Sequence, residues 1–340
     1  MLAIDGSRGE GGGQVLRSAL SLSIVTGQAF RMFNIRARRP KPGLRWQHLA
    51  AVRAAQAVSS AIVEGAGLGA TEITFTPGEL AGGRFAFDVG TAGSTTLIAQ
   101  TLIPALLQTG HSFRIAIDGG THNPMSPPFE FLARTYLPLL RRMGARVEAQ
   151  LVRRGFYPAG GGRIELNIGQ CNELAPIELC SRGSLLSKQA VAIVSRLPLT
   201  IAEQELEALG GALGWPSGVL HAREDEDSTG PGNAVIVELE FENLTEVFTG
   251  FGSKGRPARM VADSVATAVT DYLAGTAAVD AHLADQLLLP MALAGRGRFT
   301  TPQPTAHTLT NIDIVETFMP VTIGIEHNPV GPSTIHVERR

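Results

Sequence analysis

Cysteine, aromatic residues and long apolar runs are all scarce in this chain of 340 residues. Its two cysteines, Cys171 and Cys180, lie nine positions apart, which fits neither a paired-cysteine zinc site nor a disulfide framework. No apolar run approaches the roughly 20 residues of a membrane-spanning helix. The first residues also lack the basic and apolar regions of a secretory signal. We therefore expect a cytoplasmic protein that does not enter a membrane.

Aromatic residues make up only 6% of the chain, whereas glycine occurs 39 times. This pairing favours tight turns and close approaches of the backbone over large aromatic pockets. Hydrophobic residues at 44% and charged residues at 18% lie in the globular range and exclude a largely disordered chain. A length of 340 residues predicts about two domains, with a core that needs neither metal nor disulfide to fold.

Net charge is also small, at −2, so no overall basic field indicates a nucleic-acid-binding protein. The positive charge is nevertheless concentrated, because residues 11–63 contain eight Arg and Lys residues and no Asp or Glu. Such a segment is either a solvated face or a local site for phosphate or nucleic acid. The glycine-rich loop before it and the stacking surface of Trp46 within it favour the second interpretation.

Hydrophobic periodicity predicts a strand–helix–strand–helix unit that recurs along the chain. Gln100 and Pro104 are matched by Gln286 and Pro290, each pair being four residues apart and followed by a glycine. The predicted helices of the repeated units are 13–26, 44–60, 90–107, 128–143, 281–293 and 307–318. Their predicted strands are 2–5, 29–36, 73–76, 85–89, 113–117 and one near Phe299.

The interruption of this repeat predicts the domain organisation. We expect an α/β (α+β) fold with a large catalytic domain of three repeated βα units, residues 1–183 and 281–340. A small inserted α/β domain, residues 184–280, would interrupt the third unit. Its predicted strands are 190–195, 234–240 and 246–251, and its predicted helices are 201–212 and 257–274.

Residues 5–14, with the sequence DGSRGEGGGQ, form the densest glycine cluster and open the predicted helix 13–26. Backbone N–H groups of such a loop can bind phosphate at a helix N-terminus, although a purely structural turn would have the same composition. The loop is not a P-loop, because no Gly-Lys-Ser or Gly-Lys-Thr closes it. A carboxylate such as Glu10 is unusual in an anion-binding loop. We therefore interpret Glu10 as a ligand of a Mg²⁺ ion that the phosphates also bind.

A second glycine motif, residues 250–255, matches G-x-G-x-x-G between a predicted strand and a predicted helix. The acidic residue about 20 positions on, Asp271, falls inside that helix instead of at a strand end. The surrounding interval also lacks a repeated βαβ pattern. We therefore reject a dinucleotide-binding site here.

His307 follows Pro304 and Thr305 and precedes a helical pattern, which places it near a helix N-terminus. The helix dipole disfavours imidazolium there and keeps the ring neutral and nucleophilic. A lone histidine is more often structural, so the pattern alone does not select His307 as catalytic.

From end to end, the chain resembles the RNA 3′-terminal phosphate cyclases. The matching stretches are 5–17 (DGSRGEGGGQVLR), 36–48 (RARRPKPGLRWQH), 111–128 with its GGTHNP turn, 154–162 (RGFYPAGGG), 282–293 (HLADQLLLPMAL) and 307–318. The resemblance implies a large repeat-built domain, related in fold to the enolpyruvyl transferases, with a small insertion. It also implies a ligase that uses ATP to convert an RNA 3′-terminal phosphate into a 2′,3′-cyclic phosphodiester, through a histidyl-AMP and an RNA-adenylate.

Residue by residue, the resemblance implies that His307 is the nucleophile and that Glu10 holds a divalent cation, Mg²⁺ or Mn²⁺. The ATP-binding residues that it implies are Gln100, Pro127, His282, Leu283, Ala284, Asp285 and Gln286. Those for the phosphates and the RNA end are Arg17, Arg36, Arg39, Gln47 and His48. His282 departs from the family pattern, in which some members place a tyrosine against adenine.

Two alternatives belong to other functional classes. A non-catalytic ribosome-biogenesis relative of the same fold would lack the nucleophile, whereas His307 and Glu10 are both present here. An enolpyruvyl-type transferase would need no adenylation, and the HLADQ stretch argues against it. The expected partners are therefore ATP and RNA with a 3′-terminal phosphate, and the sequence leaves the oligomeric state open.

Overall fold

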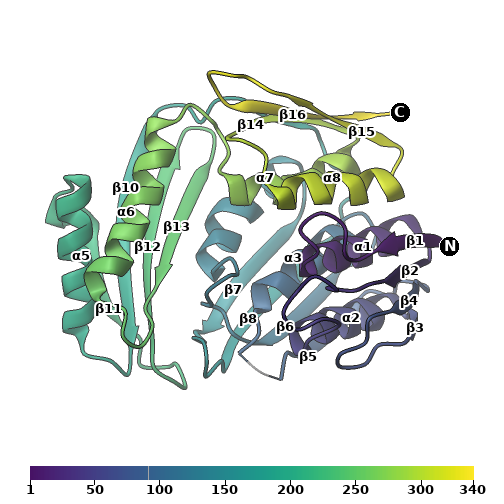
Figure 1. Ribbon diagram of the computed structural model, residues 1–340, viewed down its shortest axis with the longest axis horizontal. Coiled ribbons are helices and arrows are strands. Elements are labelled where there is room, and N and C mark those ends of the chain that lie inside the picture. Colours follow the sequence, from purple (N-terminus) through teal and green to yellow (C-terminus); the bar gives the residue numbers. More distant parts are fainter. Residues whose placement is uncertain (91) are drawn as a thin grey trace.

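The computed structural model describes residues 1–90 and 92–340, so Thr91, in the predicted helix 90–107, lies outside the description. The described chain has the predicted mixed α/β fold, with four sheets of four strands each. Three sheets belong to repeated units, and the fourth lies to one side of them, at the left of Figure 1. Within the described residues, no helix combines the length and apolar character needed to cross a bilayer.

The three units share one order of elements: strand, helix, strand, helix and two further strands. The first unit comprises β1 (Leu2–Asp5), α1 (Gly13–Thr26), β2 (Phe30–Phe33), α2 (Trp46–Ser59), β3 (Ile62–Glu64) and β4 (Ile73–Thr76). The second comprises β5 (Gly83–Asp88), α3 (Thr95–Leu106), β6 (Phe113–Gly119), η1 (Phe131–Tyr136) with α4 (Leu137–Arg142), β7 (Val147–Arg153) and β8 (Gly162–Ile168). The third comprises β9 (Ile177–Leu179), α7 (Ala281–Ala294), β14 (Arg296–Thr301), α8 (Ala306–Phe318), β15 (Val321–Glu326) and β16 (Ser333–Arg339).

The pairing of the strands is also the same in the three units. In each unit the first strand pairs in parallel with the second, and the fourth pairs antiparallel with both the second and the third. The resulting sheet orders are β1-β2-β4-β3, β5-β6-β8-β7 and β9-β14-β16-β15. The chain therefore contains three copies of one supersecondary unit.

The fourth sheet is formed by residues that lie between β9 and α7 in the chain. Its elements are β10 (Leu185–Ser195), α5 (Leu199–Leu213), η2 (Ser217–Val219), β11 (Leu220–Glu224), β12 (Gly232–Phe241), β13 (Thr245–Phe251) and α6 (Ala258–Ala274). The sheet order is β11-β10-β12-β13, and this region has its own apolar cluster, which includes Trp215 and Tyr272. Gly232 also packs against the ring of Phe156 in the second unit. The division into two domains at 184–280 stays a prediction.

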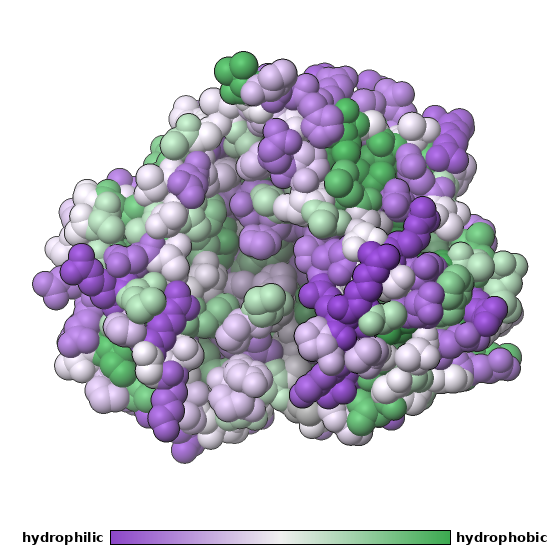
Figure 2. All heavy atoms as spheres, in the orientation of Figure 1, coloured by the Kyte–Doolittle hydropathy of each residue, from purple (hydrophilic) through white to green (hydrophobic). Residues whose placement is uncertain are grey.

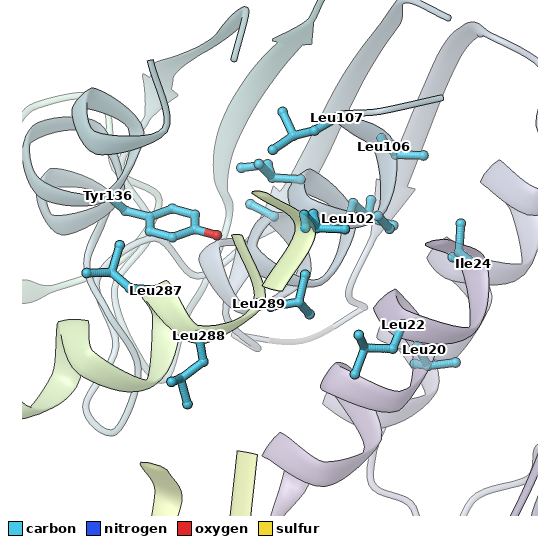
Figure 3. Close-up of a cluster of buried hydrophobic side chains, with 14 of the residues drawn as sticks. Leu20, Leu22, Ile24, Leu102, Leu106, Leu107, Tyr136, Leu287, Leu288 and Leu289 are labelled. Atoms are coloured by element: carbon cyan, nitrogen blue, oxygen red, sulfur yellow. The ribbon is translucent and has the colours of Figure 1, made fainter. Parts of the chain in front are cut away.

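The first helices of the three units, α1, α3 and α7, share one buried core (Figure 3). Figure 3 shows leucines of all three helices in this core together with Tyr136 of η1, and most of these side chains are completely buried. Truncating a buried leucine of this kind costs about 2–5 kcal/mol. Because this core fixes the three helices relative to one another, it also fixes the side chains at their N-terminal ends.

Some predicted elements end differently in the structure. The strand 29–36 is shortened to β2, because Asn34 and Arg36 adopt positive φ (54° and 53°). The helix 128–143 contains the π-helical turn η1, in which the N–H of Leu137 bonds to the carbonyl of Leu132. Pro138 follows directly, and since it has no N–H and would clash with a carbonyl one α-turn back, it explains the wider turn.

Glu246 of β13 gives the fold a dependence on pH. Its carboxyl is 1% exposed, and Oε1 accepts the N–H of Asp280, the N-cap of α7, at 2.8 Å. Burial raises the pKa of Glu246 well above its usual value, and the nearby Asp280 carboxylate raises it further. The native state therefore keeps a proton that the unfolded chain releases above pH ~4.3.

Because the native state binds this extra proton, Glu246 stabilises the fold at acidic pH and loses that contribution as pH rises through its native pKa. We expect Glu246→Gln, which stays neutral, to be more stable than wild type at pH 8 and closer to it at pH 4. Each unit of pKa elevation contributes about 1.4 kcal/mol to that difference. Urea unfolding at both pH values measures it, with the exposed Glu240→Gln as control. Parallel pH profiles for Glu246→Gln and wild type would contradict this prediction.

Candidate active site

The glycine-rich loop leaves the backbone donors at the start of α1 uncapped by any side chain. Gly9 and Gly11 adopt positive φ (55° and 60°), a conformation that favours glycine. A Cβ at Gly9 would overlap the side chain of Thr310, so the loop packs directly against α8. Gly12 caps α1 without a side-chain hydrogen bond, and the first N–H groups of the helix can therefore bind an anion.

Four helix N-termini meet around this loop. His48 lies in the first turn of α2, and Gly13 is the first residue of α1. A Cβ added to Gly13 would be only 2.6 Å from Nε2 of His48, so these two helix N-termini are in contact. Gln47 of α2 donates to the carbonyl of Ser94, the N-cap of α3, at 3.1 Å and accepts the Ser94 N–H at 2.5 Å. The N–H of Glu10 donates to Oγ1 of Thr310 in α8 at 3.2 Å. The partial positive ends of α1, α2, α3 and α8 thus lie together, an arrangement that favours phosphate.

His307 lies in the first turn of α8 and faces Glu10. Nδ1 of His307 is 3.6 Å from Oε2 of Glu10, a separation longer than a hydrogen bond. The other carboxylate oxygen of Glu10 pairs with the guanidinium of Arg39, which also donates to the Glu10 carbonyl at 3.2 Å. Because 48% of the His307 side chain is exposed, a ligand can reach the ring.

Partial burial and positive surroundings both favour the neutral form of the His307 imidazole. Partial burial lowers its pKa below the usual value, and the charges of Arg17, Arg39 and His282 lower it further. A neutral ring has a lone pair that can attack an electrophile, whereas imidazolium has none. The position at a helix N-terminus acts in the same direction.

Arg17 and His48 line the same region from α1 and α2. Burial lowers the pKa of Arg17 to about 10, against the opposing effect of the Asp285 carboxyl, so Arg17 stays charged at neutral pH. Burial lowers the pKa of His48 to about 3, and three nearby guanidinium groups add to this effect. Since Nδ1 of His48 accepts the N–H of Arg45 at 3.0 Å, the neutral ring carries its proton on Nε2. His48 is therefore a donor suited to an anion.

Arg36 shapes the loop that precedes α2. Its Nη1 donates to the carbonyls of Lys41 and Gly43 at 2.7 and 2.9 Å. Its Nε and Nη2 have no hydrogen-bond partner among residues 1–90 and 92–340, so they can serve a ligand. Arg36 thus stabilises the loop through Nη1, while its Nε and Nη2 remain available to a ligand.

A cavity of ≈ 20 Å³, enough for one water molecule, lies where α1, α3 and α7 converge. The sixth residue of each helix lines it: Ser18, Gln100 and Gln286. Gln100 is 8% exposed, and neither of its amide atoms has a hydrogen-bond partner. Burial raises the pKa of the adjacent Asp285 to about 7, and its Oδ1 is also unpartnered. Unpaired buried groups of this kind are costly unless a ligand completes their bonds.

Comparison with known proteins identifies the family. A family model described as RNA 3′-terminal phosphate cyclase matches residues 8–325. A protein of that name from Pseudomonas fluorescens is 51% identical over 328 residues, covering 96% of this chain and 95% of that protein. Its namesake from Koribacter versatilis is 48% identical, covering 96% of this chain and 92% of that protein. The chain belongs to the RNA 3′-terminal phosphate cyclase family.

The membership confirms the resemblance carried by the sequence motifs, over nearly the whole length of this cyclase-family chain. A solved structure, the enolpyruvyl transferase NikO from Streptomyces tendae, aligns with 100% of this chain and 49% of its own at 11% identity. Its TM-score is 0.39, which is too low to support a shared fold. The relation to enolpyruvyl transferases therefore stays a prediction.

Not all of the residues that the family resemblance implies as ligand contacts have side chains that point into the site. Leu283 and Ala284 have side chains buried in the core, so only their backbone can face a ligand. His282 is exposed in the first turn of α7, and Pro127 is partly exposed with its carbonyl bound by Thr96 Oγ1 at 2.6 Å. Both have surface available for a nucleotide.

Gln47 lies at the site, but both ends of its amide are already bonded to the backbone of Ser94. It therefore holds α2 against α3, and the second N–H of its amide nitrogen remains available to a ligand. Thr310 and Asn311, three and four positions after His307, also belong to the site and were not predicted from the sequence. Asn311 accepts from Ser18 Oγ at 2.6 Å and donates to the Asp285 carbonyl at 2.7 Å. The i+3 and i+4 spacing from His307 could have revealed them.

Residues of the GGTHNP and RGFYPAGGG stretches form a partly buried support beside the site. His122 bonds through Nε2 to Glu130 at 2.8 Å and through Nδ1 to Thr121 Oγ1 at 2.7 Å. Arg154 reaches the other oxygen of Glu130 at 3.6 Å. Burial raises the pKa of Glu130, but His122 and Arg154 outweigh this effect and hold it at about 2. This ionic network fixes the turn that carries Pro127.

Proposed function

We propose that this cyclase-family chain uses ATP to convert an RNA 3′-terminal phosphate into a 2′,3′-cyclic phosphodiester, with His307 carrying AMP between the two substrates. The observation that carries the proposal is the position of the His307 ring, 3.6 Å from Glu10 where four helix N-termini and Arg39 gather, and the lowered pKa of the ring agrees with it. Few other arrangements suit nucleophilic attack on a polyphosphate so directly.

The first step forms a bond between His307 and the α-phosphorus of ATP and breaks the bond to pyrophosphate. Since Nδ1 faces Glu10, Nε2 is the nitrogen that attacks. The helix N-termini and the guanidinium groups of Arg17 and Arg39 counter the negative charge of the triphosphate. Adenosine would lie towards Gln100, Asp285 and Gln286, where the amide of Gln100 and Oδ1 of Asp285 have no partner and can form hydrogen bonds with it.

In the second step an oxygen of the RNA 3′-phosphate attacks the phosphorus of His307-AMP, which releases the imidazole and forms an RNA-adenylate. In the third, the neighbouring 2′-hydroxyl attacks the terminal phosphorus, loses its proton and expels AMP. Adenylation is needed because a phosphate monoester is a poor electrophile, whereas an anhydride has a stable leaving group. Nε2 of His48, with Arg36 and Arg39, would hold the terminal phosphate, because the His48 ring keeps an N–H donor on that atom.

Glu10 is suited to a divalent cation, Mg²⁺ or Mn²⁺. Its Oε2 is buried without a hydrogen-bond partner, and carboxylate oxygen is a preferred ligand of such ions. The described residues contain no cluster of three His, Cys, Asp or Glu side chains that would hold a metal ion. The remaining ligands would then be phosphate oxygens and water, and the cation would neutralise phosphate charge. ATP and RNA as co-substrates support a cytoplasmic location.

Labelled ATP tests the proposal. The purified chain should become covalently labelled by ATP carrying the label in its α-phosphate and should not be labelled by ATP carrying it in the γ-phosphate. RNA ending in a 3′-phosphate should discharge the label, whereas RNA ending in a 3′-hydroxyl should not. A non-catalytic relative or an enolpyruvyl-type transferase would give no label, and that result would refute the proposal.

Arg39 should matter for catalysis more than for folding. Its guanidinium pairs with Glu10 beside His307, so we expect Arg39→Ala to slow cyclisation by about 10²-fold or more. Arg39→Lys should also be impaired, because a single ammonium cannot form the bidentate contacts of guanidinium. Single-turnover cyclisation of pre-adenylated enzyme measures the effect. Arg31→Ala is the control, since Arg31 lies in the same acid-free segment but pairs with Glu72 at 2.7 Å. A normal rate for Arg39→Ala would indicate a merely solvated segment.

A further inference from the structure

Trp46, the first residue of α2, holds its indole at the surface beside the candidate active site. It is 50% exposed and forms no contact with another aromatic ring or with a cation among the described residues. The other tryptophan, Trp215, is 8% exposed and packs in the core of the fourth sheet, with Lys188 Nζ 5.0 Å from the ring centre. Exposure of one apolar side chain is common and assigns nothing by itself. Its position is what distinguishes Trp46.

The two residues that follow Trp46 are anchored inside the site. Gln47 bonds to both backbone groups of Ser94, and His48 is buried against the start of α1 with its Nε2 proton available. One α-helical turn rises about 5.4 Å, so the backbone of Trp46 lies within about one turn of these residues. Helix side chains lean towards the helix N-terminus, so the exposed indole extends from the same end of α2 that reaches the region where a terminal phosphate would bind.

The chain that leads to Trp46 is strongly basic. Residues 36–45 contain four arginines, one lysine and no acidic residue, and among described residues only Arg39 of these pairs with a carboxylate. In Figure 2 hydrophilic side chains lie along the right-hand side of the central hollow, whereas hydrophobic ones lie along its left-hand side. Cations beside one exposed aromatic ring complement a single-stranded nucleic acid, whose phosphates meet the cations while a base stacks on the ring. An acidic peptide would use the cations but would have no need of the indole.

We propose that Trp46 is a stacking platform for an unpaired nucleobase near the 3′ end of the RNA. The inference rests on the proposed function, since the terminal phosphate fixes which end of the RNA reaches the site. Stacking accepts any base, so Trp46 would favour single-stranded ends without selecting a sequence. It would act on RNA binding and not on the reaction between His307 and ATP.

The test compares Trp46→Ala, Trp46→Phe and wild type on a short oligoribonucleotide with a 3′-phosphate. A second substrate of equal length has abasic sites in place of its last three bases. For the base-bearing substrate we expect Trp46→Ala to raise KM by about 5- to 100-fold, the effect of losing one base–aromatic stack, with little change in kcat. Trp46→Phe, which keeps a ring, should recover most of this loss. Leu186→Ala, at a 61% exposed site in β10, is the matched control for losing an exposed apolar side chain.

The abasic substrate separates stacking from a structural role. Wild type and Trp46→Ala should have equal KM for it, because neither can stack a missing base. An equal KM for the base-bearing substrate would overturn the inference. A loss of similar size on both substrates would also overturn it, as would a fall in self-adenylation by ATP alone, because each would show a structural effect.

A binding measurement keeps this test separate from the proposed activity. Stacking should quench the fluorescence of Trp46 as the 3′-phosphorylated oligonucleotide is added, and the quench should vanish in Trp46→Ala and in the abasic titration. This readout needs neither ATP nor turnover. A quench without covalent labelling by ATP would refute the proposed cyclase mechanism and would still support the stacking role of Trp46. Binding of the oligonucleotide without any quench would refute the platform itself.

Discussion

Replacing His307 with alanine is expected to abolish both covalent labelling by ATP and RNA cyclisation. Alanine offers no nucleophile, and His307→Asn should be as inactive, because an amide nitrogen has no free lone pair for attack. Removing the nucleophile of a covalent enzyme costs several orders of magnitude, so we expect a loss of at least about 10⁴-fold. Incorporation of α-phosphate label into the protein, followed by cyclisation of a 3′-phosphorylated oligonucleotide, measures both effects.

The chemistry of the bond gives an independent check. A phosphoramidate on His307 should be labile in acid and stable in alkali, unlike an acyl phosphate. Because the His307 side chain is 48% exposed at the first turn of α8, its removal should leave the unfolding transition nearly unchanged. His327→Ala, at an exposed histidine outside the site, is the control. Label mapped to a lysine, or full activity in His307→Ala, would refute the assignment.

The elements that could be predicted from the sequence are those with clear local signals. Helix 13–26 was predicted with the bounds that α1 has, because Gly12 and Gly27 delimit one apolar stripe and Gly27 adopts positive φ. The start of α3 was predicted too early, although Ser94 caps it by accepting the N–H of Leu97 at 3.2 Å. The strands β7, β8, β15 and β16 were not predicted. In β8 and β16 buried residues alternate with less buried ones, so a strand signal was present there, whereas β7 and β15 alternate less regularly.

The site depends on contacts that no local pattern contains. His307 and Glu10 are almost the whole chain apart in sequence, and only the packing of the first unit against the third brings them to 3.6 Å. The sequence match between Gln100 and Gln286 was visible, but not that both residues face one cavity with Ser18. Gln47 shows another case, in which a residue of a motif also bonds the N-cap of a neighbouring helix, Ser94 of α3. The chemistry of the candidate site could be predicted from its residue types, whereas its geometry depends on how the three units pack together.

Replacing Glu10 is expected to have the second largest effect. Glu10→Ala removes the buried carboxylate that faces His307 and would hold the cation, so adenylation should slow by about 10²–10³-fold. Glu10→Gln keeps the shape and the hydrogen bond from the Glu10 N–H to Thr310 but loses the charge. It should therefore be nearly as slow. The rate of labelling with α-phosphate-labelled ATP, measured across a Mg²⁺ titration, gives the effect.

Glu10 also pairs with Arg39, so its loss could act through that guanidinium instead of through a cation. A double-mutant cycle separates these roles. If Glu10 only orients Arg39, adding Glu10→Gln to Arg39→Ala should cost nothing further, and the Mg²⁺ requirement should stay that of wild type. If Glu10 holds the cation, the second substitution should slow adenylation again, and half-maximal labelling should need more Mg²⁺. Normal labelling of Glu10→Ala at low Mg²⁺ would exclude the cation role, because no other described carboxylate faces His307 at this distance.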